Sequence, residues 1–385
     1  MKVLCEVLHI FILCVSLSGA AFAVDKPTFS TAPKTNNGAK WRIGYYEGGM
    51  HNNYYHYLVA TVEGLMDLGW IKKEEIPNIK SKNNSDTWKW LKKNIRSDYI
   101  EFAEDGFYSA HWDADIRERC REALIKRLNT KRDLDLIIAM GTWAGKDMAN
   151  NRHNTPVMVM STSDPIGSGI IKNIEDSGYD FVHARVDPAR YERQVRIFHD
   201  LIGFKRLGVA YEDSVYGRTY AAIEPVEKVA KERGFEIVRC YTKSDIADLQ
   251  KAGDSVIKCF EEMAGKVDSI YVTQQGGVNT ETIDRLVNLT IKNQIPTFSQ
   301  LGSTEVQKGL LLSISRGGYR HVGKFHAATF AAVFNGAKPR QLNQLFEEPP
   351  KFAINLKTAE EIGLYLYADF LAAADEIYSE IDKSP

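Results

Sequence analysis

Two short apolar runs separated by a helix-forming turn constrain the fold of this chain most strongly. Leu134–Met140 and Pro156–Met160 have the length and the branched apolar side chains of buried parallel strands. Between them, Gly141–Gly145 opens a helix that extends to about Asn151. The second run ends in Ser161–Gly169, a polar turn rich in helix-capping residues. The pattern predicts part of a doubly wound parallel sheet, with both turns at strand carboxyl ends, where such sheets bind ligands.

The same alternation of strands and helices recurs along most of the chain, with the last helix expected to reach about residue 381. The other predicted strands are Trp41–Tyr46, Ile76–Ile79, Phe181–Val186, Arg206–Tyr211, Phe235–Val238, Ser269–Thr273, Ile295–Phe298, Leu310–Ile314 and Phe352–Leu356. The fold class is therefore α/β, with two doubly wound parallel-sheet lobes joined by a hinge and a ligand cleft between facing strand ends. We expect residues 41–165 with about 310–340 in the first lobe, and 166–309 with about 341–385 in the second.

Residues 1–23 differ from the rest of the chain. A lysine near the start precedes the apolar segment Val7–Ser18, which is followed by the small-x-small sequence Ala21–Ala23. This order predicts a secretory signal peptide that is cleaved after Ala23, and hence a periplasmic protein. Cys14 follows a leucine instead of the small residue that lipoprotein processing takes, so we expect no lipid anchor.

Two further segments break the alternation. Residues 24–40 are polar and contain two prolines, and we expect them to form a flexible leader. The region before Asp115 is rich in aromatic residues interleaved with charges, and we expect an insertion near Asn94–Asp113. The insertion either packs on one lobe or overhangs the cleft, and its aromatic residues form either its own core or a ligand cage.

Composition and cysteine usage exclude several classes of protein. The formal charge of −1 gives no basic surface for nucleic acid, and a 44% hydrophobic, 26% charged composition is that of a globular protein, which we expect to be a monomer. Beyond residue 23 the cysteines are Cys120, Cys240 and Cys259, with no CxxC motif or Cys/His cluster. We therefore expect no metal and no cofactor. A Cys240–Cys259 bridge and three separate thiols both remain compatible with the sequence.

Several phrases, in order, resemble the ABC-transporter substrate-binding protein family of the type I periplasmic-binding fold, in its tryptophan- and tyrosine-type branch. They are Ala139–Thr142, Pro156-Val157, Ser163–Gly169, Leu207–Tyr211, Pro296–Ser299, Gly309–Leu311, Gly323, Asn335–Pro339 and Ile354–Ala359. The resemblance implies a soluble component that closes two lobes on a small molecule and delivers it to the membrane permease of an ABC transporter. Gln274-Gln275 departs from the aspartate or threonine usual at that turn.

Closure of two lobes requires polar groups from both to meet on one ligand. The candidate ligand-binding residues stand in the predicted turns of both lobes: Tyr46, Glu47, His51, Thr142, Trp143, Ser163, Asp164, Tyr211, Asp213, Tyr216, Gln274, Gln275, Asn279 and Gln300. Each has a structural alternative. Thr142 is also suited to cap its helix, Trp143 to close a core, and Asp164 to form an Asx turn before Pro165. Acidic and amide groups beside helix starts favour an amino-acid-like ligand.

Two other functions are considered. A secreted sensor component that docks on a membrane receptor kinase uses the same lobe-closing module. A secreted enzyme is the more distant alternative, because the chain has no GxSxG elbow and no GxGxxG or GxxxxGK[ST] phosphate loop. The histidine pairs His51/His56 and His321/His326 are spaced by five residues, which places each pair on different helix faces. We therefore expect binding and not catalysis.

Overall fold

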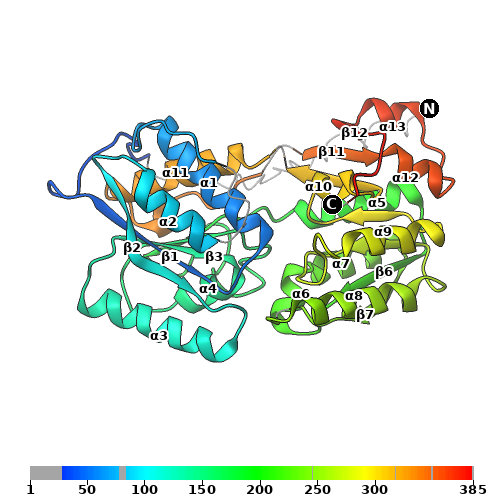
Figure 1. Ribbon diagram of the computed structural model, residues 1–385, viewed down its shortest axis with the longest axis horizontal. Coiled ribbons are helices and arrows are strands. Elements are labelled where there is room, and N and C mark those ends of the chain that lie inside the picture. Colours follow the sequence, from blue (N-terminus) through cyan, green and yellow to red (C-terminus); the bar gives the residue numbers. More distant parts are fainter. Residues whose placement is uncertain (1–27, 78–83, 245, 317, 348–349, 384–385) are drawn as a thin grey trace, which may run out of the picture.

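The computed structural model describes residues 28–77, 84–244, 246–316, 318–347 and 350–383. Two α/β lobes lie side by side along the longest axis (Figure 1). The expected signal peptide, residues 1–23, lies outside the described residues. Within the described ranges, none of the helices has both the length and the apolar character needed to span a bilayer.

The first lobe is built on a five-stranded parallel sheet of order β2-β1-β3-β4-β5. Its strands are β1 (Trp41–Glu47), β2 (Ile100–Ser109), β3 (Leu136–Met140), β4 (Val157–Met160) and β5 (Val182–Ala184). Its helices are α1 (Asn52–Asp67), α2 (Asn84–Asn94), α3 (Ala114–Thr130), α4 (Gly141–Met148) and, from later in the chain, α11 (Arg320–Phe334). Alternate strand residues enter two buried clusters, so both faces of the sheet are covered.

The second lobe holds a seven-stranded sheet of order β12-β11-β10-β9-β8-β6-β7. Its strands are β6 (Arg206–Tyr211), β7 (Glu236–Tyr241), β8 (Ser269–Val272), β9 (Thr297–Ser299), β10 (Leu312–Arg316), β11 (Pro350–Asn355) and β12 (Glu376–Tyr378). Its helices are α5 (Arg190–Ile202), α6 (Val215–Tyr220), α7 (Ile223–Arg233), α8 (Leu249–Met263), α9 (Ile283–Lys292), α10 (Ser303–Gln307), α12 (Leu356–Glu361) and α13 (Ala368–Ala372). All its strand pairs are parallel except β10 with β11.

The chain passes between the lobes after β5, between β10 and α11, and again before β11. Two of these crossings are hydrogen bonded to each other. The Val186 amide donates to the Gln344 carbonyl at 2.7 Å, and the Phe346 amide donates to the Val186 carbonyl at 3.0 Å. A short 3-10 turn, Pro339–Gln341, precedes the last crossing. Narrow paired crossings of this kind permit a hinge between two rigid lobes.

The boundaries of the lobes differ from those expected from the sequence. β5 belongs to the first sheet, so the first crossing follows residue 184 instead of residue 165. β10 belongs to the second sheet, although α11 directly after it packs against α1 of the first lobe. The close α1–α11 contact depends on Gly64 and Gly323, because a Cβ on Gly323 would lie 2.3 Å from a backbone oxygen of α1. The C-terminal segment also forms α12, α13 and β12 instead of one long helix.

The expected insertion near Asn94–Asp113 is in fact β2, an edge strand parallel to β1. Trp88 of α2 and Phe102 of β2 are buried in the first-lobe core, while Trp112, after β2, lines the cleft between the lobes. The strand expected at Ile76–Ile79 is not present at its first two residues, and its last two lie outside the described residues. An edge strand has one neighbour and tolerates charges, which is why its alternation was not visible in the sequence.

Residues 28–40 do not form the expected flexible leader. Phe29 packs against the first-lobe core. The indole of Trp70 donates to the Thr31 carbonyl at 2.8 Å, and the Asn335 side chain donates to the Ala32 carbonyl at 3.0 Å. The segment is therefore fixed to the first lobe by one apolar contact and by side-chain donors that bond its backbone.

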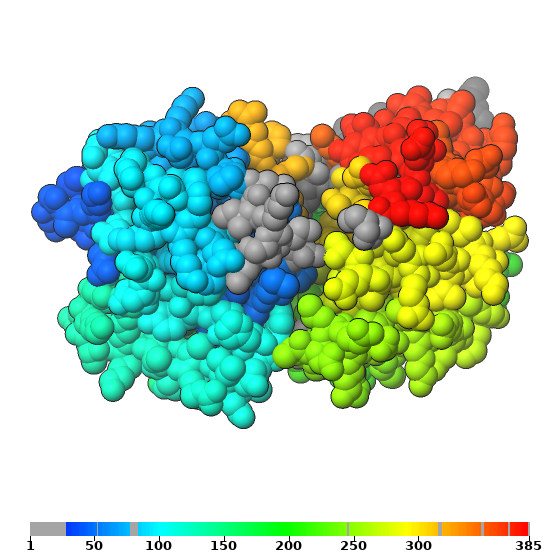
Figure 2. Space-filling view, in the orientation of Figure 1, coloured from blue at the N-terminus to red at the C-terminus, as the bar shows by residue number. Residues whose placement is uncertain are grey.

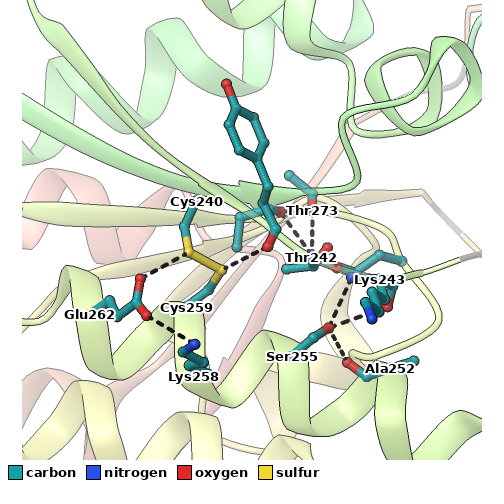
Figure 3. The surroundings of a disulfide bond; sticks show 12 residues. Cys240, Thr242, Lys243, Ala252, Ser255, Lys258, Cys259, Glu262 and Thr273 are labelled. Carbon is teal, nitrogen blue, oxygen red and sulfur yellow. Dashed lines mark hydrogen bonds and ion pairs between the residues drawn. A yellow bond between two sulfur atoms is a disulfide. The ribbon is translucent and has the colours of Figure 1, made fainter.

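A disulfide joins Cys240 at the end of β7 to Cys259 in α8 (Figure 3). This settles the alternative that the sequence left open, and Cys120 is a half-buried free thiol. Next to the bridge, the Ser255 hydroxyl accepts from the Lys243 amide at 3.0 Å (Figure 3). The bridge and this hydrogen bond together tie the strand end that leads to the cleft onto α8.

Candidate ligand-binding cleft

A cleft of about 850 Å³, open solvent included, lies between the carboxyl ends of the strands of the two lobes. The lining residues come from both lobes: Met50, His51, Tyr54, Trp112, Thr142, Trp143, Ser161, Ser163, Tyr220, Ser244, Leu249, Gln274, Gln275, Gly276, Val278 and Asn279. None of these side chains carries a formal charge at neutral pH if His51 is neutral.

The first-lobe side of the cleft is an aromatic wall formed by Trp112 and Trp143. Their rings meet edge to face with centroids 5.4 Å apart. Gly48 and Gly49 make this approach possible, because a Cβ on Gly49 would lie 2.5 Å from the Trp112 ring. The Trp112 indole N–H donates to the Met50 carbonyl at 3.0 Å, whereas the Trp143 indole N–H has no hydrogen-bond partner among the described residues.

Trp143 stands in the first turn of α4, at the carboxyl end of β3. Gly141 starts this helix with φ +84°, and a Cβ there would overlap the Tyr54 hydroxyl, so glycine is required. The N-cap residue is Met140, whose side chain makes no capping hydrogen bond. The expected capping by Thr142 is therefore not what the structure shows. α4 therefore begins beside the cleft without a side-chain cap, and such a helix N-terminus suits a negatively charged group.

Amide side chains line the second-lobe side of the cleft, and they differ in how many hydrogen bonds they make within that lobe. Gln275 is saturated, because it donates to the Ala210 carbonyl at 2.8 Å and accepts from the Thr242 hydroxyl at 2.7 Å. Asn279 donates to the Gly276 carbonyl and accepts from the Glu281 amide within its own loop. Gln274 instead extends its side chain toward the first lobe. Gln275 and Asn279 thus shape the wall, and Gln274 presents a polar group.

His51 contacts Gln274 across the cleft, with 3.4 Å between the two Nε2 atoms. The His51 Nδ1 atom accepts from the Asn53 amide at the start of α1, so a neutral ring carries its proton on Nε2. Burial lowers the pKa of His51 to about 4. The ring is therefore uncharged at neutral pH, and its Nε2–H suits the amide oxygen that a half-turn of the Gln274 side chain would present.

Seven of the fourteen residues predicted from the sequence line the cleft: His51, Thr142, Trp143, Ser163, Gln274, Gln275 and Asn279. Tyr216 stands beside them, with its ring 6.5 Å from that of Trp143. The structure does not bring the other six to the cleft. Their roles are structural in this conformation, as described next.

The two predicted aspartates bind groups near them in the chain instead of lining the cleft. Asp164 accepts from the amides of Ile166 and Gly167, at 3.1 and 2.8 Å, so it forms the Asx turn that was its structural alternative. Asp213 is half exposed and lies 3.9 Å from Arg218 in an ion pair.

The remaining four are buried behind the cleft. Tyr46 donates to Asp147 at 2.6 Å, and the buried Tyr211 lies 3.4 Å from Arg218. Gln300 accepts from the Gln274 amide at 2.6 Å and donates to the Tyr220 carbonyl at 2.9 Å. It therefore positions two cleft residues without touching the cleft itself.

Glu47 is the fourth of these, and it lies in a polar cluster between β1, β2 and α2. It accepts from the Tyr45 hydroxyl, the Asn84 amide and the Ser109 hydroxyl at 2.8, 2.8 and 2.9 Å. Burial raises the pKa of the Glu47 carboxyl to about 7 despite these hydrogen bonds. A carboxyl so buried belongs to the core and is not free to meet a ligand.

The raised pKa of Glu47 predicts a pH dependence of stability. Between the unfolded value of about 4.3 and the folded value near 7, the folded state binds more protons, so the free energy of unfolding falls as pH rises through this window. Urea unfolding at pH 5, 6, 7 and 8 measures this slope. Glu47→Gln is expected to flatten it. Half-buried Glu305, whose pKa is also raised to about 7 by loss of solvent around its carboxyl, retains part of the slope. Identical slopes in both proteins would contradict the assignment.

Nine cleft residues are not among those predicted from the sequence, and they include Met50, Tyr54, Trp112, Tyr220 and Leu249. Met50 and Tyr54 lie within the predicted turn after β1, from which only Glu47 and His51 were predicted to bind ligand. Trp112 was visible as the last aromatic residue of the unusual stretch, but its approach to the cleft depends on left-handed backbone at His111 and Trp112, with φ +51° and +58°.

Comparison with known proteins gives relatives of the same architecture. An ABC domain from Streptococcus pneumoniae in complex with L-Trp is 19% identical with a TM-score of 0.67, covering 88% of this chain and 100% of that one. A conserved domain protein from Vibrio cholerae is 18% identical with a TM-score of 0.67, covering 88% and 99%. A ligand-free, open substrate-binding protein with adhesive properties from Clostridium difficile is 17% identical with a TM-score of 0.59, covering 88% and 100%.

These structural matches have the type I periplasmic-binding fold, with its two parallel-sheet lobes. No curated protein matches the sequence. The family model described as ABC transporter substrate binding protein matches residues 110–378, which is more than half of the chain and includes strands of both lobes. The chain therefore belongs to the ABC transporter substrate-binding protein family.

Proposed function

We propose that this protein is the extracytoplasmic solute-binding component of an ABC importer, and that its lobes close on a small, flat, polar ligand of amino-acid-like chemistry. The observation that carries the proposal is the Trp112–Trp143 wall at the start of α4, which faces the Gln274 amide of the other lobe across the cleft. A flat apolar face and a polar edge are thus presented to one molecule from two sides.

Each part of the cleft suits one part of such a ligand. The edge-to-face tryptophans supply a broad apolar surface against which a ring can pack. The N-terminus of α4 has no side-chain cap and carries partial positive charge, so it suits a carboxylate. The described lining side chains carry no formal positive charge that would bind the carboxylate instead. The unpartnered indole N–H of Trp143 suits a hydrogen-bond acceptor. That the Streptococcus relative was solved with L-Trp makes aromatic amino acids the first ligands to test.

Features outside the cleft support an extracytoplasmic location and a permease partner. The Cys240–Cys259 disulfide is typical of an oxidising compartment. The leading sequence, residues 1–23, has the pattern of a cleaved signal peptide. Family membership supports a small molecule as ligand and an ABC permease as the membrane partner that receives it.

A thermal-shift screen of the chain from Val24 onward tests the proposal. The panel contains aromatic and other amino acids, nucleosides, sugars and organic acids. A true ligand at 100 times its dissociation constant adds about 2.7 kcal/mol to the folded state and raises the unfolding midpoint. We expect a hit among aromatic amino acids or close analogues. Hits only among sugars or nucleosides would reject the ligand class, and no hit with protein shown to be ligand-free by native mass spectrometry would count against small-molecule binding.

A further inference from the structure

A second contact between the lobes lies beside the cleft and centres on Arg117 of α3. Its guanidinium stacks over the Trp143 ring at 4.5 Å and over the Tyr216 ring at 5.1 Å. Its Nη2 also donates to the Tyr216 hydroxyl at 3.2 Å. Arg117 and Trp143 belong to the first lobe, whereas Tyr216 belongs to α6 of the second. The cation is therefore held between an aromatic ring of the cleft wall and one from the opposite lobe.

Arg117 is fixed in place from behind by Asp147 of α4. The Asp147 carboxylate accepts from Nε and Nη2 of Arg117, with distances of 2.8–3.1 Å, and from the Tyr46 hydroxyl at 2.6 Å. Asp147 is 5% exposed, and the Arg117 side chain is 17% exposed. A planar guanidinium that donates from two of its nitrogens to one carboxylate cannot rotate freely, so the first lobe fixes its orientation.

The opposite partner depends on closure. Tyr216 is half-buried, at the start of a short helix capped by Ser214, whose hydroxyl accepts from the Gly217 amide at 2.9 Å. In the space-filling view, atoms of the α3 region and of the α6 region meet at the near surface below the centre of the molecule (Figure 2). Opening of the hinge separates these surfaces and removes both the stacking and the hydrogen bond from Arg117.

We propose that Arg117 is a positioning residue that couples the cleft wall to lobe closure, with Tyr216 as the latch on the second lobe. A ligand packed on Trp143 fixes the ring against which the guanidinium stacks, and the guanidinium in turn holds Tyr216. Binding thereby stabilises a contact outside the cleft, and the contact slows release of the ligand. The coupling to ligand rests on the function proposed above, whereas the latch between the lobes does not require that any particular ligand binds.

Closure without ligand is measured first. Thiols introduced by His51→Cys and Gln274→Cys, in a Cys120→Ser background, are joined by a short dithiol-reactive linker when the lobes meet. Even a minor closed population is trapped in this way. We expect Tyr216→Phe, which keeps the ring but removes the hydroxyl, to slow the reaction by up to about threefold. Tyr216→Ala removes both contacts and is expected to slow it by up to about tenfold.

Matched variants separate the latch from general effects on the fold. Arg117→Lys keeps a cation for Asp147 but loses the planar stacking, so it is expected to behave like Tyr216→Ala. Arg121→Lys, on the same helix and paired with Glu118 and Glu122, is expected to leave the linker reaction unchanged. Thermal midpoints of the Tyr216 variants are expected to match the parent, because Tyr216 is half-buried and outside the buried core. Equal linker rates in the parent and Tyr216→Ala would overturn the latch.

The second measurement uses radiolabelled L-tryptophan as the probe, chased with unlabelled L-tryptophan. Release is expected to quicken in the order parent, Tyr216→Phe, Tyr216→Ala, with a smaller change in the association rate, because the latch forms after the probe has entered. Parent protein that retains no L-tryptophan would reject that ligand, while the linker rates still decide the latch. Retention with identical release rates in all three proteins would reject the coupling.

Discussion

Trp143→Ala is expected to weaken ligand binding about a hundredfold, or roughly 2.7 kcal/mol, which is the scale of a central aromatic contact. Trp143 is 9% exposed and contributes three features at once: the ring that meets Trp112, an indole N–H without a described partner, and the surface on which Arg117 stacks. Trp143→Phe retains a ring but no donor, and we expect an intermediate loss. Isothermal titration with the ligand found by the screen measures both.

The control for Trp143→Ala is Tyr365→Ala, which removes an aromatic side chain that is 83% exposed on the second lobe. Its affinity is expected to equal that of the parent. Circular dichroism at the titration temperature verifies that each variant is folded, since removal of a large buried ring also lowers stability. An unchanged affinity in folded Trp143→Ala would remove the aromatic wall from the binding site.

Asp147→Ala is expected to lower the free energy of unfolding by about 3 to 5 kcal/mol, because it leaves a largely buried guanidinium without its partner. Asp147 accepts both hydrogen bonds of the Arg117 fork and one from Tyr46, so its loss also leaves the Tyr46 hydroxyl without this acceptor. Urea unfolding followed by circular dichroism measures the change. Affinity is expected to fall as well, since Arg117 no longer has a fixed orientation against Trp143.

Glu118→Ala provides the comparison for Asp147→Ala. Glu118 also pairs with an arginine of α3, but its side chain is 58% exposed, and such surface pairs contribute little. We expect a change within about 0.5 kcal/mol. If Asp147→Ala were equally mild, the ion pair would have to be replaced by water without cost, and the argument that Arg117 is fixed by the first lobe would fail.

Local sequence patterns were sufficient to predict β3, α4 and β4. The two apolar runs are continuous, fully buried and separated by a short helix. Their secondary structure can therefore be predicted from these residues without the rest of the chain. Thr142 and Trp143 at the start of α4 and Ser163 after β4 lie at the cleft because they directly follow strand ends. By contrast, β2 has Glu104 and Asp105 in its middle, and only its position at the sheet edge makes those charges tolerable.

Residue type alone did not separate ligand-facing groups from buried ones. Glu47 is the last residue of β1, at the strand end where a cleft residue would lie, but its side chain turns back to Tyr45, Asn84 and Ser109. Gln300 directly follows β9, and its side-chain oxygen accepts from the Gln274 backbone amide and so holds that turn. Direction of a side chain at a strand end depends on which partners the neighbouring elements bring within hydrogen-bond distance, and a single sequence does not contain those distances.

The sequence by itself determined the class of fold, the order of most of its strands and helices, and the turns from which much of the cleft is made, because these follow from local periodicity and turn chemistry. Only the tertiary structure decided that β10 joins the second sheet while α11 packs on the first lobe, and that Cys240 meets Cys259. It alone placed Arg117 between Trp143 and Tyr216. Those contacts join residues distant in sequence, and their energies depend on packing that no local pattern encodes.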